Sequence, residues 1–201
     1  MAISLKKGQK VNLHKSEKVS LGEILINLNW NSKPVKQGLF SGLLGGSKGI
    51  DLDLGCLYEL KNGQKGAVQA LGNAFGSLKS PPYVSLDGDD RTGAVKTGEN
   101  LRINGDKISE IKRILVYTFI YEGVANWQQA DAIVTIRYPG AEDLIVKMDS
   151  YHSNDGMCGL VLFENVNDET FSVEKIVQFY PGHQALDRAF HWGMNWRAGR
   201  K

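Results

Sequence analysis

Hydrophobic and polar residues alternate with a period of two along much of this chain. The alternation is clear over residues 24–30 and 50–60. Because successive side chains of a β-strand point to opposite faces, this period predicts half-buried strands. Further segments rich in Val, Ile, Phe and Tyr lie between Gly, Asn, Asp or Pro residues, at 101–103, 111–121, 132–138, 144–148, 159–163 and 171–180. With no helices between them, about nine or ten strands predict an all-β fold, a two-sheet β-sandwich.

Two local patterns refine this prediction. Residues 61–64 (Lys-Asn-Gly-Gln) contain an Asn-Gly step, the strongest short-range signal for a β-hairpin, and predict a tight turn after the strand over 50–60. Residues 111–121 are apolar at nearly every position. Such a run is typical of a central strand that is covered on both faces.

Residues 37–49 interrupt the alternation of hydrophobic and polar residues, because they combine five glycines with Leu and Phe side chains. The segment is too rich in glycine for a strand and too apolar for a simple linker, so we expect a mobile loop. Two interpretations stay open. Its apolar side chains contact a partner or the inner face of the membrane, or they fold back onto the core.

Near the C-terminus the period changes to that of a helix. Leu186, Ala189 and Phe190 follow helical spacing, and Trp192 and Trp196 lie one turn apart beside them. We expect a short C-terminal helix that packs across a sheet edge. Aromatic residues on such a helix are more often core anchors than a stacking surface for bases, so we expect no nucleic-acid partner.

Composition sets further bounds. The 201 residues, with 24 basic and 22 acidic side chains and a net charge of +2, are consistent with one domain over residues 1–201 and exclude a polycationic nucleic-acid binder. The N-terminus lacks the apolar region of a signal peptide, and the longest apolar run, 114–121, is too short to span a bilayer. We expect a soluble, cytoplasmic protein without a transmembrane segment.

Several kinds of chemistry find little support in the sequence. The glycine-rich run 42–49 lacks the Gly-Lys-Ser/Thr ending of a phosphate-binding loop, and the four histidines show no metal-ligand spacing. Cys56 and Cys158 lie in apolar, strand-like surroundings, which favour two buried free thiols over a disulfide or a nucleophile.

Two acidic clusters carry the strongest chemical signal. Asp51 and Asp53 alternate with apolar residues, so their carboxylates lie on one strand face about 6.6 Å apart. Residues 87–93 (Asp-Gly-Asp-Asp-Arg-Thr-Gly) suit a loop around a cation, although Thr92 and Gly98 break the EF-hand pattern. Candidate calcium ligands are the carboxylates in or near these clusters: Asp51, Asp53, Asp87, Asp89, Asp90 and Glu99. Alternatively, these residues are turn formers and solvated strand-face carboxylates.

The same residues resemble a known family. Residues 48–54 (Lys-Gly-Ile-Asp-Leu-Asp-Leu) and 88–93 (Gly-Asp-Asp-Arg-Thr-Gly) are similar to the two signatures of the TerD family of tellurium-resistance and general-stress proteins. Residues 3–9 resemble that family's opening strand, and the resemblance covers nearly the whole chain. Segments 56–60, 68–73 and 192–196 are most similar to one paralogous branch.

The resemblance implies a two-sheet β-sandwich that binds Ca²⁺ through its acidic loops, has no established catalytic activity, and acts with other tellurium-resistance proteins. From their positions in the family motifs, the resemblance implies that the cation is bound by Asp51, Asp53, Asp89, Asp90 and Glu99. Asp87 is a weaker candidate ligand, because it lies just before the second motif.

One departure from the family pattern bears on affinity. Typical family members have a dense run of acidic residues here, whereas residues 94–100 of this chain contain one acidic residue, Glu99, and the basic residue Lys96. With fewer carboxylates, calcium affinity should be lower than in typical members, or one of two sites should be lost. Three function classes stay open. They are a calcium-binding stress-response protein acting through partners, a metal-independent interaction module of the same system, and an enzyme acting on oxyanions or membrane-derived substrates, which only Cys158 favours.

Overall fold

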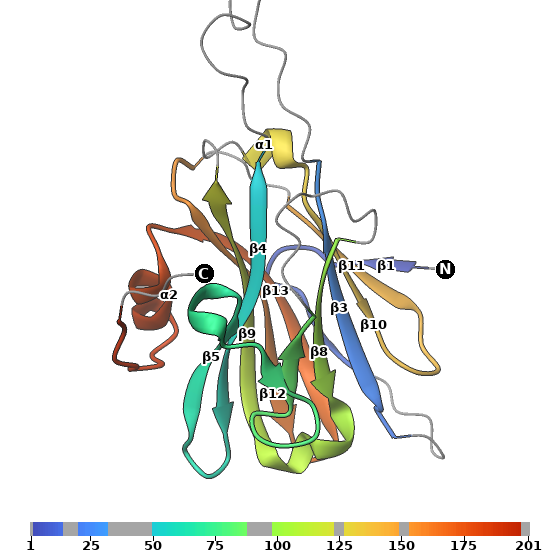
Figure 1. The fold of residues 1–201 in the computed structure, drawn as a ribbon. Coiled ribbons are helices and arrows are strands. Elements are labelled where there is room, and N and C mark those ends of the chain that lie inside the picture. The colour runs from blue at the N-terminus through green and yellow to red at the C-terminus, as the bar shows by residue number, and fades with distance from the viewer. Residues whose placement is uncertain are drawn as a thin grey trace, which may run out of the picture.

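Two β-sheets pack face to face around one hydrophobic core (Figure 1). The computed structural model describes residues 2–13, 20–31, 50–87, 98–122, 127–148 and 153–197. The glycine-rich segment 37–49 and the candidate ligands Asp89 and Asp90 lie outside these ranges.

The first sheet has seven strands in the order β1-β11-β10-β3-β8-β7-β6. Its strands are β1 (Ala2–Ser4), β3 (Glu23–Asn29), β6 (Gly76–Ser77), β7 (Val84–Leu86), β8 (Glu99–Asn104), β10 (Ile133–Arg137) and β11 (Asp143–Lys147). All neighbours pair antiparallel except β1 and β11, which pair parallel.

The second sheet has six strands in the order β2-β13-β12-β9-β4-β5, and all of its neighbours pair antiparallel. Its strands are β2 (Lys10–Asn12), β4 (Asp51–Leu60), β5 (Lys65–Gln69), β9 (Ile111–Glu122), β12 (Met157–Val166) and β13 (Thr170–Tyr180). Short helical turns are η2 (Leu71–Asn73), η3 (Gly105–Glu110), α1 (Trp127–Ala130) and α2 (His183–Ala189).

The all-β, two-sheet fold class predicted from the sequence is confirmed. The described residues form thirteen strands, more than the nine or ten expected. The strands outside the predicted segments are β2, β6 and β7, which have only two or three residues, whereas β1 overlaps the opening strand implied by the family resemblance. A strand of that length contains too few positions for a period of two to be read from the sequence.

The alternating positions fill the space between the sheets. In β3 the side chains of Ile24, Ile26 and Leu28 are fully buried, and β4 contributes Leu52 and Leu54 to the same core. Each such side chain contributes roughly 1.5–3 kcal/mol of burial free energy, so the pattern that predicted the strands also stabilises them.

Strand β9 is central, as predicted, because it pairs with β12 on one side and β4 on the other. Ile114 and Val116 face the core between the sheets, whereas Leu115 and Tyr117 face a second hydrophobic cluster on the outer surface of the six-stranded sheet. The predicted hairpin joins β4 to β5, where the backbone N–H of Leu60 donates to the carbonyl of Gln64 at 2.8 Å.

The C-terminal segment covers that outer surface. Figure 1 shows α2 beside the six-stranded sheet. Leu186 of α2 and Trp192 pack on side chains from β4, β9, β12 and β13. The predicted short helix is present, but it lies over the sheet face, not across an edge. It also ends at Ala189, so the expectation that Trp192 and Trp196 lie one helical turn apart is wrong.

Asp187 explains why the helix does not continue. Its buried carboxylate accepts hydrogen bonds from the backbone N–H groups of Gly193 at 2.8 Å and Met194 at 3.0 Å, and from the indole Nε1 of Trp196 at 2.9 Å. His191 and Gly193 have positive φ angles of 54° and 71°, which reverse the chain. The side chain of Asp187 therefore holds the segment after α2 against the helix itself.

Candidate functional site

Strand ends from both sheets meet at one end of the sandwich. Strand β4 begins at Asp51 and β8 begins at Glu99. The end of β3 lies beside both, because Leu28 pairs with Glu99 and the indole Nε1 of Trp30 donates to the carbonyl of Ile50 at 3.0 Å. The fold thus brings together parts of the two acidic clusters that are far apart in the sequence.

Glu99 is the side chain that links the two sheets here. It occupies an inward position of β8, in alternation with the buried residues Leu101 and Ile103, and is only 3% exposed. Its Oε2 accepts a hydrogen bond of 2.6 Å from the backbone N–H of Leu54, the residue after Asp53. We refer to Asp51, Asp53 and Glu99 as the acidic end.

Asp53 is 1% exposed, and Asp51 is half-buried. Asp53 is opposite Phe119 of β9, close enough to the phenol of Tyr117 to act on it electrostatically. Burial raises the pKa of Tyr117 well above its usual value, and Cys56 and Asp53 add smaller electrostatic contributions. The alternative that these carboxylates form a solvated strand face therefore does not hold for Asp53.

Asp87 is placed differently from the acidic end. Its carboxylate accepts hydrogen bonds from Nε of Arg102 at 2.9 Å and from a terminal nitrogen of the same guanidinium at 2.7 Å, and Arg102 also pairs with Glu23. Arg102 lies on the outward face of β8, opposite to the inward face that carries Glu99. These hydrogen bonds and their charges raise the pKa of Arg102 further above its ordinary value.

The described residues supply only part of the predicted calcium shell. Asp89 and Asp90 lie outside the described ranges, in the segment that leaves after Asp87 and returns at Gly98. Within those ranges, no group of three or more His, Cys, Asp or Glu side chains is gathered closely enough to hold a metal ion. The six to eight oxygens of a calcium site would thus have to include groups outside the described ranges, among which Asp89 and Asp90 are the predicted ligands.

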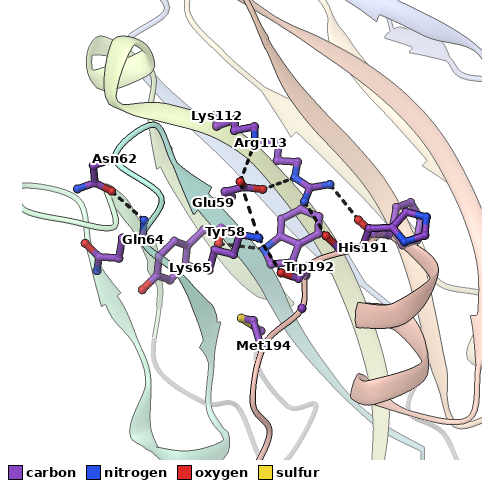
Figure 2. Close-up of polar contacts among 12 residues, drawn as sticks. Tyr58, Glu59, Asn62, Gln64, Lys65, Lys112, Arg113, His191, Trp192 and Met194 are labelled. Carbon is purple, nitrogen blue, oxygen red and sulfur yellow. Dashed lines mark hydrogen bonds and ion pairs between the residues drawn. The ribbon is translucent and has the colours of Figure 1, made fainter.

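Another nearly buried carboxylate, Glu59, lies near the other end of β4, and sequence reasoning missed it. Glu59 is 5% exposed and accepts hydrogen bonds from Nζ of Lys112 at 2.8 Å and Nε of Arg113 at 2.6 Å, with Nζ of Lys65 at 3.9 Å (Figure 2). Burial opposes ionisation of Glu59, but the hydrogen bonds and charges of Lys112 and Arg113 outweigh it and lower the pKa of this carboxyl.

Arg113 extends this network to the C-terminal segment. Its guanidinium lies 3.8 Å from the centre of the Trp192 ring and donates to the carbonyls of Phe190 at 2.9 Å and His191 at 3.2 Å (Figure 2). The indole Nε1 of Trp192 donates to the carbonyl of Tyr58 at 3.0 Å. We call Glu59, Lys112, Arg113 and Trp192 the C-terminal latch.

Comparison with known proteins decides the family. The TerD domain matches residues 1–139, a range that contains the whole acidic end. The chain belongs to the TerD family. Three of the four latch residues lie before residue 139 and Trp192 lies beyond it, so the family match does not cover the docked C-terminal segment.

Curated relatives of this TerD-family chain carry names from tellurium resistance and stress response. Tellurium resistance protein TerA from an Alcaligenes species is 42% identical over 199 residues, which is 99% of this chain and 58% of the relative. Stress response protein SCP2 of Bacillus subtilis is 36% identical over 132 residues, 64% of this chain and 65% of the relative. The chain thus spans about three fifths of the length of these relatives.

Solved structures share the fold. A protein of unknown function, SAV2460, has a TM-score of 0.61 at 14% identity, with 84% of this chain and 95% of the other covered. A homologue of telluride resistance protein (TerD) from Streptomyces coelicolor A3(2) has a TM-score of 0.58 at 16% identity, with 83% and 95% covered. At such identities the likeness shows the sandwich fold alone.

The two thiols of this TerD-family chain are buried and unbridged, as predicted. Burial raises the pKa of Cys56 to about 12 and raises the pKa of Cys158 further still. The thiolate, which is the nucleophilic form of cysteine, is thus disfavoured at both positions near neutral pH.

Proposed function

We propose that this chain is a calcium-binding stress-response protein that contributes to tellurite resistance through protein partners. The observation that carries the proposal is the acidic end, where Glu99 from one sheet binds the backbone beside Asp53 of the other with both side chains almost fully buried. The names of the curated relatives support the stress-resistance role.

The donor set of the acidic end suits calcium. Carboxylates are hard oxygen ligands, and a buried carboxylate needs positive charge or hydrogen bonds to offset its lost hydration. Asp51, Asp53 and Glu99 would hold the ion together with Asp89 and Asp90, and Asp87, bound to Arg102, is the least suited of the predicted ligands. When bound, calcium would neutralise these charges and join the strands that supply them.

The proposed role is not enzymatic. Both thiols are buried with raised pKa values, so neither favours a thiol-based reaction with an oxyanion. We expect cells carrying Cys56→Ala and Cys158→Ala together to keep their tellurite tolerance, provided that the variant is folded and abundant. Loss of tolerance in such cells would favour thiol chemistry instead.

The partners would be other tellurium-resistance proteins. The protein would be located in the cytoplasm and would contact some of these partners at the inner face of the membrane. Among the described residues, no helix has the length and apolar character needed to cross a bilayer.

Calorimetric titration of metal-stripped protein tests the proposal. We expect saturable heat with calcium and less with magnesium, whose octahedral, water-retaining shell suits a multi-carboxylate site poorly. Asp53→Asn should weaken calcium binding, whereas Asp143→Asn should leave it unchanged, because Asp143 pairs with Arg137 on another part of the seven-stranded sheet. If millimolar calcium gives no heat, the second candidate, a metal-independent interaction module, takes the place of the first.

A further inference from the structure

A cavity of about 530 Å³ opens where α2 and the segment after it pass the end of β5. It lies on the outer surface of the six-stranded sheet, the same face on which Asp53 acts electrostatically on Tyr117. Cavities of roughly 300–1,000 Å³ are the usual size for small-molecule sites. The residues that decide its chemistry are Gln69, His183, Arg188, Trp196 and Arg197.

The floor of the cavity is a fixed polar network. Oε1 of Gln69, a residue only 9% exposed, accepts a hydrogen bond of 2.6 Å from the buried hydroxyl of Tyr117 and lies 3.0 Å from Nε2 of His183. Gly55 makes this placement of Tyr117 possible, because a Cβ there would lie 2.8 Å from the phenol ring. With its oxygen held in this way, Gln69 has its amide nitrogen left to donate to a ligand.

One wall of the cavity is aromatic. The rings of His183 and Trp196 lie 5.1 Å apart, and the indole of Trp196 is held by Asp187. Burial lowers the pKa of His183, so this imidazole is largely neutral near pH 7. The planes of the two rings are inclined by 47°, and hydrogen-bond partners hold each ring, so a planar group can stack on one ring while the other contacts its edge.

The rim of the cavity is cationic. Arg188 and Arg197 both line it, and none of the described residues that line it is acidic. In the part of the chain that the structure describes, neither guanidinium forms an ion pair, in contrast with Arg113 in the latch. The nearest carboxylate in sequence, Asp187, is turned inward onto the backbone of Gly193 and Met194.

We propose that this cavity is a binding site for a small organic anion that carries a planar ring. The ring stacks on Trp196 with its edge toward His183, the anionic group pairs with Arg188 and Arg197, and Gln69 donates to a polar atom of the ligand. Guanidinium groups bind carboxylates and phosphates through paired hydrogen bonds, so either acid can supply the charge. The proposal does not depend on calcium.

Calorimetry with four probes tests this proposal. 1-Naphthyl phosphate and 2-naphthoate carry both the ring and the charge, inorganic phosphate carries the charge alone, and 1-naphthol carries the ring alone. We expect the two ring-bearing anions to bind and each single-feature probe to bind at least about tenfold more weakly, since each lacks one set of contacts. The tighter of the two anions identifies the preferred acid. Chelation of calcium should leave these affinities unchanged.

Variants locate the binding. Arg188→Gln and Arg197→Gln, which are surface changes, should each weaken 1-naphthyl phosphate binding by roughly tenfold, as expected for lost charge-assisted hydrogen bonds. Arg137→Gln, a surface arginine on β10, is the matched control and should bind as the unmodified protein does. The proposal is overturned if neither ring-bearing anion binds at millimolar concentration, if inorganic phosphate binds as tightly as they do, or if Arg137→Gln weakens binding as much as the pocket variants.

Discussion

Strand β4 carries two nearly buried carboxylates, Asp53 toward one end and Glu59 toward the other, and they lie in different surroundings. Glu59 is matched by the side chains of Lys112 and Arg113, which belong to the neighbouring strand of the same sheet. Asp53 lies beside the hydrogen bond that the backbone N–H of Leu54, a neutral group, donates to Glu99. Burial of an acid therefore does not by itself indicate a ligand site, because at Glu59 basic side chains of the same sheet supply the compensating charge.

The largest effect should come from breaking the latch. Arg113→Ala leaves Glu59 with Lys112 at 2.8 Å and Lys65 at 3.9 Å and removes the contact with Trp192. Loss of one partner of a buried ion pair costs about 3 kcal/mol or more. The thermal midpoint should then fall by roughly 6–12 °C, measured by circular dichroism. Arg137→Ala, which breaks an exposed pair with Asp143, should cost at most about 1 kcal/mol. Equal costs for the two variants would show that the latch is not a stabilising unit.

A smaller, pH-dependent effect should follow from Glu59→Gln. The folded pKa of Glu59 is lowered, so its ionised form stabilises the protein fully above the unfolded value of about 4.3, and this contribution disappears as the pH falls through the folded pKa. Urea unfolding should show a cost of about 2 kcal/mol at pH 7 that shrinks toward pH 3. A cost that stays constant or grows on acidification would contradict the assignment.

The smallest effect should come from Asp87→Asn. This carboxylate is bound to Arg102 in a partly exposed pair, so its loss should lower the free energy of unfolding by about 0.5–1 kcal/mol. Calcium should still bind the variant with similar heat in calorimetry. Loss of calcium binding would show that Asp87 is a ligand, and that its carboxylate leaves Arg102 when it binds the ion.

Much of the fold could be predicted from periodicity alone. The alternation over 50–60, the Asn-Gly turn and the apolar run over 111–121 correspond to β4, its hairpin and the central strand β9. The C-terminal segment could not be predicted in this way, because its path depends on Asp187 binding backbone groups six and seven residues later. A tertiary hydrogen bond of this kind leaves no periodic signal.

The candidate site was predictable only in part. The acidic motifs predicted that Asp53 and Glu99 belong to one site. The structure places the Glu99 carboxylate on the backbone N–H of the residue after Asp53, but the two carboxylates lie on opposite faces of β4, Glu99 toward the core and Asp53 toward Tyr117. The latch was missed because the pairing of Glu59 with Arg113 depends on strand register, which a single sequence does not show. Its two basic residues are adjacent in β9 and look like ordinary surface charges when read alone.

Whether the acidic end binds calcium is tested most directly by comparing Glu99 with Glu59 for their effect on the stabilisation of the protein by calcium. The thermal midpoint is measured with and without calcium for the unmodified chain, Glu99→Gln and Glu59→Gln. At a hundredfold excess over the dissociation constant, calcium should add about 2.7 kcal/mol of stability to the unmodified chain and raise its midpoint by roughly 5–11 °C. Glu59→Gln should keep this rise from its lower starting midpoint, and Glu99→Gln should lose most of it. A rise that survives in Glu99→Gln but disappears in Glu59→Gln, or no rise in the unmodified chain, would contradict the assignment of the acidic end as the calcium site.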